Sequence, residues 1–324
     1  MTLLLDKDVL RKSLPMKEAI SAVEEGFRLS KTALVPQRIP LKIERHNAVF
    51  LYMPAYVGGM DALVVKEVSV HPDNPKKGLP TVQGTILLND PSSGSLLAIL
   101  EGGSLTAIRT GATTGVATKY LSRRDATNLG IFGCGVQART QLEAIACVRR
   151  IHKAKVYDIN ATAAKKFAFE MSELLGIDVK IANSPRDVLE GMDIIVTATT
   201  SKIPVFSGEW IAPGTHINGI GSHTPDAREL DTETIRRSRV IVDSREACLE
   251  EAGDIIIPIN EGAITVDHIK ADLGEVVRGE CDARTSDEEV TVFKSVGLAL
   301  EDAVVALRAY IIARDKGLGK IIEL

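Results

Sequence analysis

The stretch LGIFGCGVQARTQLEAI, residues 129–145, begins with a short apolar run and continues into an amphipathic segment. Between them lies the pattern Gly133-x-Gly135-x-x-Ala138, which predicts a strand, a glycine turn and a helix. Gly133 permits a tight turn, Gly135 lets the backbone approach a pyrophosphate, and Ala138 allows close packing of helix on strand. The start of the helix presents free N–H groups to the phosphates. This context favours a Rossmann-type dinucleotide-binding turn over a glycine turn without a ligand.

An acidic residue follows the next predicted strand. The segment Lys155-Val-Tyr-Asp158 places a carboxylate near the separation from the glycines, roughly 20 residues, that such sites show. A carboxylate there accepts both ribose hydroxyls and repels a 2′-phosphate, and no arginine directly follows it to reverse that preference. The two motifs together predict NAD as the cofactor.

The chain has 324 residues, more than one hydrophobic core usually holds, so two domains are expected. The first third reads as mixed α/β. The elements expected there are a helix over 16–30, strands over 41–43, 48–53 and 63–70, and an antiparallel hairpin of 85–88 with 96–100.

From residue 129 the pattern changes to strand–helix alternation, which predicts a parallel sheet with covering helices. A last helix over 298–314, with Gly317 as a plausible C-cap, is long enough to pack back on the first third. The expected fold is therefore α/β, with a Rossmann-type NAD domain over 120–302 inserted in a mixed α/β domain over 1–119 and 303–324. The strands expected after residue 129 are 129–132, 154–157, 179–182, 194–197, 216–220 and 240–242.

The composition is that of an ordinary globular protein, with 45% hydrophobic and 25% charged residues and a net charge of −4. No basic block indicates a nucleic-acid partner, and no apolar run approaches the ~20 residues that span a bilayer. The N-terminus lacks the apolar region of a signal peptide. The four cysteines match neither a zinc pattern nor a disulfide framework, and the histidines show no ligand spacing. We therefore expect a cytoplasmic enzyme without a metal.

Hydride transfer also needs a cation for an acidic substrate group and an acid/base for a proton. Lys66 stands in an otherwise apolar strand, where it lies either in a cleft with a lowered pKa or on the solvent face of an edge strand. Arg109, among small residues, suits a carboxylate, with a surface salt bridge as the alternative. Arg38 between two prolines is a second candidate clamp. His223 follows a strand and either handles a proton or is an ordinary loop histidine.

The assembled segments resemble the ornithine cyclodeaminase/mu-crystallin family over nearly the whole chain. The segments that carry the resemblance are Val65-Lys-Glu-Val-Ser-Val-His-Pro72, Lys77-Gly-Leu-Pro-Thr81, Leu105-Thr-Ala-Ile-Arg-Thr-Gly111, Gly133-Cys-Gly-Val-Gln137, His216-Ile-Asn-Gly-Ile-Gly221, Pro225-Asp-Ala-Arg-Glu-Leu-Asp231, Ser286-Asp-Glu-Glu-Val290 and Val292-Phe-Lys-Ser-Val-Gly-Leu-Ala-Leu-Glu-Asp302.

The resemblance implies that the first domain with the C-terminal helix binds substrate and forms a homodimer. It implies that Arg38, Lys66 and Arg109 approach the substrate carboxylate, that Lys66 is the catalytic proton donor and acceptor, and that Val296 lies beside the substrate. The glycine motif and the resemblance together predict cofactor contacts at Thr81, Arg109, Gly133, Gly135, Val136, Gln137, Asp158, Asn160, Thr199, Ile220, Gly221 and Ser295.

Two departures from the cyclodeaminase pattern bear on the reaction. Cyclodeaminases carry a catalytic aspartate where this chain has His223, and a glutamate that meets the distal amine of ornithine where it has Leu51. We therefore expect an NAD(H)-dependent oxidoreductase that interconverts a small L-amino acid and its imino or 2-oxo acid. The expected type is an alanine dehydrogenase or a reductase of Δ1-pyrroline-2-carboxylate or another cyclic ketimine. The alternatives are ornithine cyclodeamination with recycled NAD, and a non-catalytic binding protein similar to mu-crystallin.

Overall fold

The structure is a computed structural model that describes residues 2–323, apart from the side chain of Pro75. The chain divides into two compact units, unit 1 with Met1–Thr110 and Leu298–Leu324, and unit 2 with Gly111–Gly297. The sequence places the same two boundaries somewhat later, at 119/120 and 302/303. The functions assigned to the two domains remain predictions.

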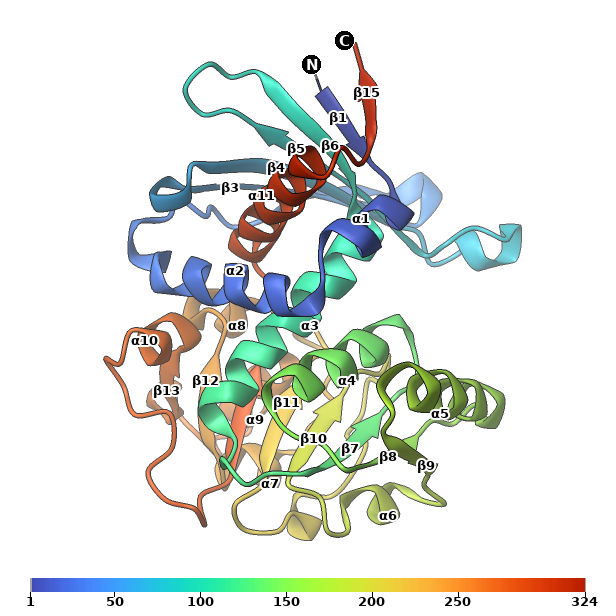
Figure 1. The fold of residues 1–324 in the computed structure, drawn as a ribbon. Coiled ribbons are helices and arrows are strands. Elements are labelled where there is room, and N and C mark those ends of the chain that lie inside the picture. The colour runs from blue at the N-terminus through green and yellow to red at the C-terminus, as the bar shows by residue number, and fades with distance from the viewer. Residues whose placement is uncertain (1, 324) are drawn as a thin grey trace. The chain divides into compact units, whose positions relative to one another are not determined.

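Unit 1 is built on a mixed sheet of seven strands in the order β15-β1-β6-β5-β4-β3-β2 (Figure 1). Strands β1 and β6 are parallel, and the other neighbours are antiparallel. The strands are β1 (Thr2–Leu5), β2 (Ile39–Ile43), β3 (Ala48–Val57), β4 (Ala62–Val70), β5 (Val82–Asn89), β6 (Leu96–Glu101) and β15 (Lys320–Ile322). The helices are α1 (Lys7–Ser13), α2 (Met16–Arg28) and α11 (Ala299–Asp315), and the 3₁₀ turns are Ser30–Thr32, Glu44–His46, Gly58–Met60 and Asn74–Lys77.

One face of this sheet is covered by helix α11, which lies across β3 and β4 beside α2 (Figure 1). The two helices approach closely at Gly26, where a Cβ would lie 2.9 Å from Val304 Cγ1. The buried side of α2 carries Ala19, Val23 and Phe27, at the helical spacing seen in the sequence. The predicted C-terminal helix is confirmed as part of unit 1.

The antiparallel hairpin of β5 and β6 is also confirmed. Sequence reasoning missed the pairing of β15 with β1, and it missed helix α3 (Gly102–Leu121). Helix α3 begins in the residues of unit 1 and ends in those of unit 2. Among residues 2–323, no helix has the length and apolar character needed to cross a membrane.

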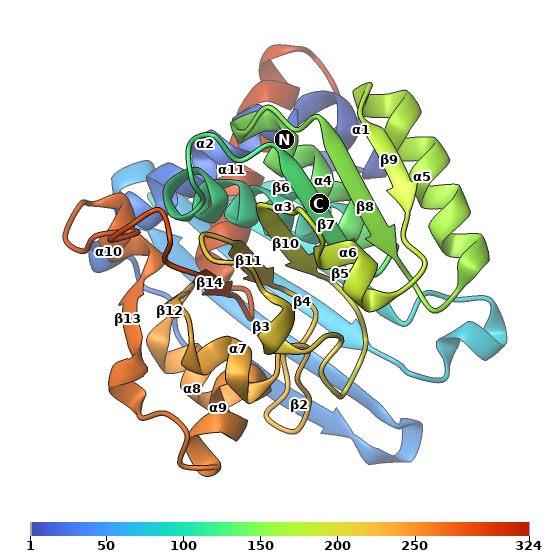
Figure 2. The same cartoon turned by 90° about the horizontal axis from the view of Figure 1, so that it is seen from below.

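Unit 2 contains a parallel sheet of eight strands in the order β13-β12-β14-β11-β10-β7-β8-β9 (Figure 2). The strands are β7 (Asn128–Phe132), β8 (Lys153–Tyr157), β9 (Asp178–Ile181), β10 (Ile194–Thr197), β11 (His216–Gly219), β12 (Arg239–Val242), β13 (Ile269–Asp272) and β14 (Thr291–Lys294). The helices are α4 (Val136–Val148), α5 (Ala161–Leu175), α6 (Pro185–Leu189), α7 (Thr232–Arg236), α8 (Arg245–Glu251), α9 (Gly253–Asn260) and α10 (Leu273–Val277), and the 3₁₀ turns are Gly208–Trp210 and Val266–His268.

The chain leaves β7 toward β8 and β9, then returns to the other side of β7 with β10. Strands β7 and β10 are therefore the point where the strand order reverses, and ligands of such sheets bind there, at the carboxyl ends of the strands. A core of apolar side chains from β7 to β10 and from α4 and α5 supports this half of the sheet. The six strands predicted after residue 129 are confirmed within about two residues at their ends. Strands β13 and β14 were missed.

A buried histidine lies at the start of strand β11. His216 Nδ1 is 2.9 Å from Thr291 Oγ1, and its Nε2 is 3.2 Å from Asn218 Oδ1. Burial, the largest effect, and the positive charge of the nearby Arg284 together lower the pKa of His216 to about 3. The folded unit therefore holds this histidine neutral at pH values where an unfolded chain would protonate it.

We expect unit 2 to lose stability as the pH falls from 6.5, the ordinary pKa of histidine, to about 3. Over this range His216 is protonated in the unfolded chain but stays neutral in the folded unit, so protonation favours the unfolded chain. The loss amounts to about 1.4 kcal/mol per pH unit. Urea titrations followed by fluorescence of Trp210, the single tryptophan, measure it. His216→Gln should reduce the pH slope, and the control His152→Gln, at an exposed position, should not. Equal slopes in wild type and His216→Gln would contradict the prediction.

Candidate active site

Lys66 lies on strand β4, which has β3 on one side and β5 on the other. Burial alternates along the strand: Ala62, Val64 and Lys66 are buried, while Val65 is exposed. Lys66 is only 2% exposed and lies on the face that α11 covers. The structure therefore excludes the solvent face of an edge strand, the alternative that the sequence left open.

Two acids at the start of α11 meet the predicted cations of unit 1. Lys66 Nζ lies 2.7 Å from Asp302 Oδ2, and Arg109 Nη1 lies 2.5 Å from Glu301 Oε2. Arg109 Nε is also 3.2 Å from Asp302 Oδ1. All four residues are buried, so the ion pairs of Arg109 are not surface salt bridges, the alternative that the sequence left open. Acids in the first turn of a helix are also favoured by the helix dipole.

The environment of Lys66 adjusts its pKa toward neutrality. Burial has the largest effect and lowers the pKa, while the negative charge of Asp302 raises it. The positive charges of Arg109 and Arg38 also lower it, and the net pKa of Lys66 is about 8. Arg38, half-buried just ahead of β2, thus acts electrostatically on the same group. The structure brings Lys66 and Arg109 together around Asp302, and Arg38 is near enough for its charge to act on Lys66. A lysine with a pKa of about 8 both donates and accepts a proton near neutral pH.

Sequence reasoning missed Glu301 and Asp302 as members of this cluster. The sequence signal was that Glu301 and Asp302 stand in the otherwise apolar run ALEDAVVA, residues 299–306, although the sequence does not show which cations they meet; the structure buries all eight residues. Carboxylates in such a segment must meet cations or hydrogen-bond donors. Thr81, the remaining predicted residue of unit 1, is half-buried just ahead of β5, and its carbonyl accepts the N–H of His71 at 2.8 Å.

The glycine turn of unit 2 has the geometry that a pyrophosphate needs. Gly133 has a φ of 91°, and a Cβ there would overlap the carbonyl oxygen of Ala198. Gly135 is the N-cap of α4, and the space where its Cβ would stand is open. Because the cap residue has no side chain, it leaves the first N–H groups of α4 for an anion. Gln137 adds a buried Oε1 that accepts no hydrogen bond from residues 2–323. These residues fit a bound dinucleotide.

Asp158 follows strand β8 and is held by backbone at both oxygens. Its Oδ2 accepts the N–H of Cys134 and its Oδ1 the N–H of Asn160, each at 2.8 Å. The first bond ties the carboxylate to the glycine turn, and its free lone pairs remain for ribose hydroxyls. Asn160 caps helix α5 by accepting from Thr162 and Ala163, which gives this predicted cofactor residue a structural role as well.

We expect Asp158→Ala to weaken the binding of NADH more than that of NADPH, because it removes the predicted acceptor for ribose hydroxyls and a charge that would repel a 2′-phosphate. The ratio of kcat/KM for NADH to that for NADPH should fall about tenfold or more, the equivalent of ~1.4 kcal/mol. Steady-state assays with each cofactor measure it, with Asp178→Ala, an exposed acid after the next helix, as the control. An unchanged ratio would remove Asp158 from cofactor selection.

A buried carboxylate organises the loops after β10 and β11. Glu229 accepts the N–H of Thr199 and the N–H of Gly221, each at 2.6 Å, and the hydroxyl of Thr197 at 2.8 Å. Both backbone donors belong to predicted cofactor residues. Ile220, between the loops, donates its N–H to the carbonyl of Thr197 at 2.9 Å. Glu229 thereby fixes the position of both loops at the carboxyl edge of the sheet.

Glu229 is in turn supported by an ion pair behind it. Asp254 accepts the N–H of Glu229 at 2.7 Å, and its other oxygen lies 2.8 Å from Lys294 Nζ. Burial raises the pKa of Glu229, and the positive charge of Lys294 opposes that change. Lys294 also donates to the carbonyl of Ser222 at 2.6 Å. Sequence reasoning assigned no function to Glu229, Asp254 or Lys294.

A second acid fixes the turn after β14. Asp243 Oδ2 accepts from Ser295 Oγ at 2.8 Å, from Val296 N at 2.8 Å and from Gly297 N at 2.7 Å. This turn holds the predicted cofactor residue Ser295 and the predicted substrate residue Val296. The predicted residues of unit 2 therefore all follow the carboxyl ends of strands in one sheet.

The two positions that depart from the cyclodeaminase pattern are both placed. Leu51 pairs with Val68, and Met53 pairs with Lys66, so Leu51 shares the sheet face of Lys66 one step along the neighbouring strand. His223 is exposed in the loop after β11, with Nδ1 3.4 Å from the carbonyl oxygen of Gly221.

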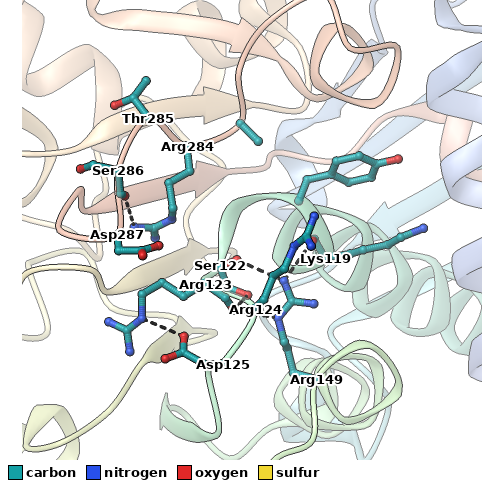
Figure 3. A pocket seen from close by; sticks show the side chains of 12 residues that line it. Lys119, Ser122, Arg123, Arg124, Asp125, Arg149, Arg284, Thr285, Ser286 and Asp287 are labelled. Atoms are coloured by element: carbon teal, nitrogen blue, oxygen red, sulfur yellow. Dashed lines mark hydrogen bonds and ion pairs between the residues drawn. The ribbon is translucent and has the colours of Figure 1, made fainter.

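A pocket of about 970 Å³ lies elsewhere in unit 2 (Figure 3). Its lining residues precede strands β7, β8 and β14, which places it at the amino edge of the sheet, opposite the glycine turn. Arg149 donates there to the carbonyls of Thr118, Lys119 and Ser122 at the end of α3, and Arg284 to that of Leu121. These guanidinium groups cap a helix. The pocket is therefore separate from the glycine turn and the other predicted cofactor residues of unit 2.

The fold and the site define a class of protein before any comparison. A parallel sheet, a glycine turn after its first strand and an acid after its second define a Rossmann-type dinucleotide-binding protein. A model of the ornithine cyclodeaminase/mu-crystallin family matches residues 2–317. The chain belongs to this family.

Known relatives resemble the chain over nearly its whole length. The alanine dehydrogenase of Archaeoglobus fulgidus is 40% identical over 324 residues, which cover 99% of this chain and 98% of that one. The Δ1-pyrroline-2-carboxylate reductase of Bacillus cereus is 41% identical over 318 residues, 97% of each chain. The solved structure of Thermococcus litoralis Δ1-pyrroline-2-carboxylate reductase in complex with NADH and L-proline is 52% identical, with a TM-score of 0.95 over 99% of this chain and 100% of that one.

Proposed function

We propose that this protein is an NAD(H)-dependent oxidoreductase that interconverts a small L-amino acid and its imino or 2-oxo acid. Its type is that of an alanine dehydrogenase or a reductase of Δ1-pyrroline-2-carboxylate or another cyclic ketimine. The observation that carries the proposal is Lys66, buried beside Arg109 and held by Asp302, with a pKa lowered to about 8. The similarity to two such enzymes at 40% and 41% identity supports it.

In this reaction Arg38 and Arg109 hold the substrate carboxylate, because guanidinium groups bind carboxylates with two parallel hydrogen bonds. Lys66 donates a proton to, or accepts one from, the substrate nitrogen or a water molecule. Bound NAD(H) supplies or accepts the hydride at the substrate α-carbon. The low exposure of Lys66 and Arg109 strengthens these charge contacts, because little water competes for them.

Cofactor binding uses the predicted residues of unit 2 together with Thr81 and Arg109 of unit 1. The N–H groups at the start of α4 receive the pyrophosphate, and Asp158 receives the adenosine ribose. Thr199, Ile220, Gly221 and Ser295 contribute further contacts at the carboxyl edge. The open glycine turn supports NAD as the cofactor, and so does the NADH bound to the similar reductase of Thermococcus litoralis.

Ornithine cyclodeamination is the alternative, and two residues oppose it. Leu51 offers no charge to a distal amine, and His223 offers no carboxylate at the position of the cyclodeaminase aspartate. A scan of absorbance at 340 nm with NADH, offering pyruvate plus ammonia, cyclic imines and ornithine, separates the candidates. NADH consumption with one of the first two supports the proposal. Ammonia release from ornithine without NADH consumption on the others refutes it, and no turnover at all favours a binding protein.

A homodimer and a cytoplasmic location belong to the same proposal. The face of the unit 1 sheet opposite Lys66 carries exposed apolar side chains from four strands, β1, β2, β4 and β5, and apolar side chains gathered on one face are typical of an interaction surface. A second copy of this chain covers it best, because a dimer with twofold symmetry pairs such a face with itself. All four cysteines are free thiols, which supports a reducing compartment. The exposed apolar residues are Leu4, Ile39, Leu41, Val65 and Leu87.

Charged substitutions on this face should separate the subunits. Val65 and Leu87, which pair on β4 and β5, are 37% and 38% exposed. We expect Val65→Lys and Leu87→Lys, each alone, to shift the protein from dimer to monomer in sedimentation velocity. The control Leu174→Lys, on the exposed side of α5 in unit 2, should remain a dimer. A wild-type protein that sediments as a monomer at micromolar concentration would refute the dimer.

A further inference from the structure

The proposed function makes no use of the pocket of about 970 Å³ at the amino edge of the unit 2 sheet (Figure 3). All of its lining residues belong to unit 2, so the pocket is complete within one compact unit. Its volume suits a small molecule, since pockets for such ligands measure about 300–1,000 Å³. We propose that this pocket binds phosphate, either free or as part of a small organic molecule, and that Arg124 and Arg149 contact the phosphate oxygens. This site is independent of the proposed function.

Arg124 and Arg149 are two neighbouring cations of the pocket that form no ion pair with residues 2–323 (Figure 3). Arg124 follows α3 and is exposed, and its side chain forms no hydrogen bond with the described residues. Arg149 follows α4, is half-buried and donates only to backbone carbonyls. Burial lowers the pKa of Arg149, and the positive charge of Arg124 lowers it too. Two like charges at such close range repel each other, and a bound anion would relieve that repulsion.

Hydrogen-bond donors for an anion remain in this pocket. Nη1 of Arg149 uses one hydrogen on the carbonyl of Val148, which leaves its second hydrogen, and all the N–H groups of Arg124 remain. The hydroxyl of Ser286, exposed in the loop before β14, donates to no residue of 2–323. These donors come from three segments of the chain. A phosphate group accepts hydrogen bonds on three oxygens that point in different directions, so it suits donors from three segments better than a planar carboxylate does.

The other arginines of the pocket already lie near acids. Nε of Arg123 is 3.2 Å from Asp125 Oδ1. Burial lowers the pKa of Arg284, while the negative charges of Glu289 and Asp287 raise it. Asp287 lines the pocket, is exposed and forms no ion pair with residues 2–323. Its negative charge should therefore weaken the binding of an anion, which predicts a variant with increased affinity.

Isothermal titration calorimetry at constant ionic strength, with sodium phosphate and with glycerol 3-phosphate, tests the inference. We expect the wild type to bind at least one of them with a Kd of about 1 mM or below. The compound that binds more tightly shows whether the ligand is free or organic phosphate. Arg124→Gln should raise this Kd about tenfold or more, because it removes a charge-assisted contact. Arg150→Gln, at an exposed residue outside the pocket lining, removes the same charge and should leave the Kd within about twofold of wild type.

Two further measurements give the site its sign and its chemistry. Asp287→Asn should lower the Kd about threefold, and acetate should bind the wild type at least about tenfold more weakly than phosphate. Comparison of variants with wild type separates the pocket from any phosphate at the glycine turn, which these substitutions leave intact. Circular dichroism melts verify that each variant is folded. A wild-type Kd above about 10 mM for both phosphate compounds, acetate bound as tightly as phosphate, or an unchanged Kd in folded Arg124→Gln would each overturn the inference.

Discussion

Replacing Lys66 by methionine is expected to lower kcat/KM for imine reduction about a thousandfold or more, the equivalent of ~4 kcal/mol of transition-state stabilisation. Methionine keeps most of the volume of the buried stem but removes both the proton and a positive charge near the substrate carboxylate. NADH binding, measured by fluorescence titration, should change little, because the predicted contacts of Lys66 are with the substrate. Lys42→Met, at an exposed position of the same sheet, is the control.

The variant Lys66→Arg separates the two functions of the residue. Arginine keeps the charge that attracts a carboxylate but holds its proton at all ordinary pH values. We expect KM for the substrate to change less than kcat in this variant. Circular dichroism melts identify any variant that loses its fold. Turnover of Lys66→Met within about tenfold of wild type would show that Lys66 is not the acid/base.

The pH dependence of the wild type follows from the same group. With Lys66 as the acid in imine reduction, kcat/KM should be level below about pH 8 and fall tenfold per pH unit above it, because the protonated form is the active one. In amino acid oxidation Lys66 is the base, so kcat/KM should rise with pH and level off above about 8. Stopped-flow or steady-state assays in both directions measure these limbs. If kcat/KM changed with pH in the same direction for both reactions, Lys66 would not be the acid/base.

The Rossmann half of unit 2 could be predicted because its signals are local. The apolar run of β7, the glycine turn and Asp158 all stand within one βαβ segment, and the structure bears out the strands and helix α4. Helix α3 could not be predicted in this way, since it is rich in glycine and threonine, which disfavour isolated helices. Its small residues serve packing instead: a Cβ at Gly111 would overlap the backbone of Thr140 in α4. Helix propensities of single residues do not predict tertiary contacts of this kind.

The same difference between local signals and tertiary contacts applies to the candidate site. Lys66 and Arg109 could be singled out as cations in apolar or small-residue segments. Their partners Glu301 and Asp302 stand about 190 residues beyond Arg109 in the chain, and only the fold of α11 onto β4 unites them. A residue's partner over such a separation depends on register and packing, which a single sequence does not contain. The buried acids therefore had to come from the structure.

Replacing Glu229 by alanine is the second large effect that we expect. The change leaves three donors without their acceptor, the buried Thr197 hydroxyl and the N–H groups of the half-buried Thr199 and Gly221. Each such loss costs about 1–3 kcal/mol, so the free energy of unfolding of unit 2 should fall by about 3–6 kcal/mol after partial compensation by water. Urea titrations followed by fluorescence of Trp210 report on this unit. Glu233→Ala, at a half-exposed acid of α7 whose partners are arginines, should change it by less than about 1 kcal/mol.

The milder variant Glu229→Gln tests whether this carboxylate positions the cofactor loops or only stabilises the unit. Glutamine keeps the shape and one acceptor oxygen, but its NH₂ group faces one of the two backbone N–H groups, so one loop must move. If Thr199 and Gly221 contact NAD, the dissociation constant of NADH should rise about tenfold while the substrate KM at saturating NADH stays within about twofold, because the substrate residues of unit 1 are untouched. A purely structural function would lower the melting temperature of the apoprotein and leave the NADH dissociation constant unchanged. Glu229→Asp keeps the charge on a shorter side chain and should fall between Glu229→Gln and wild type in NADH affinity.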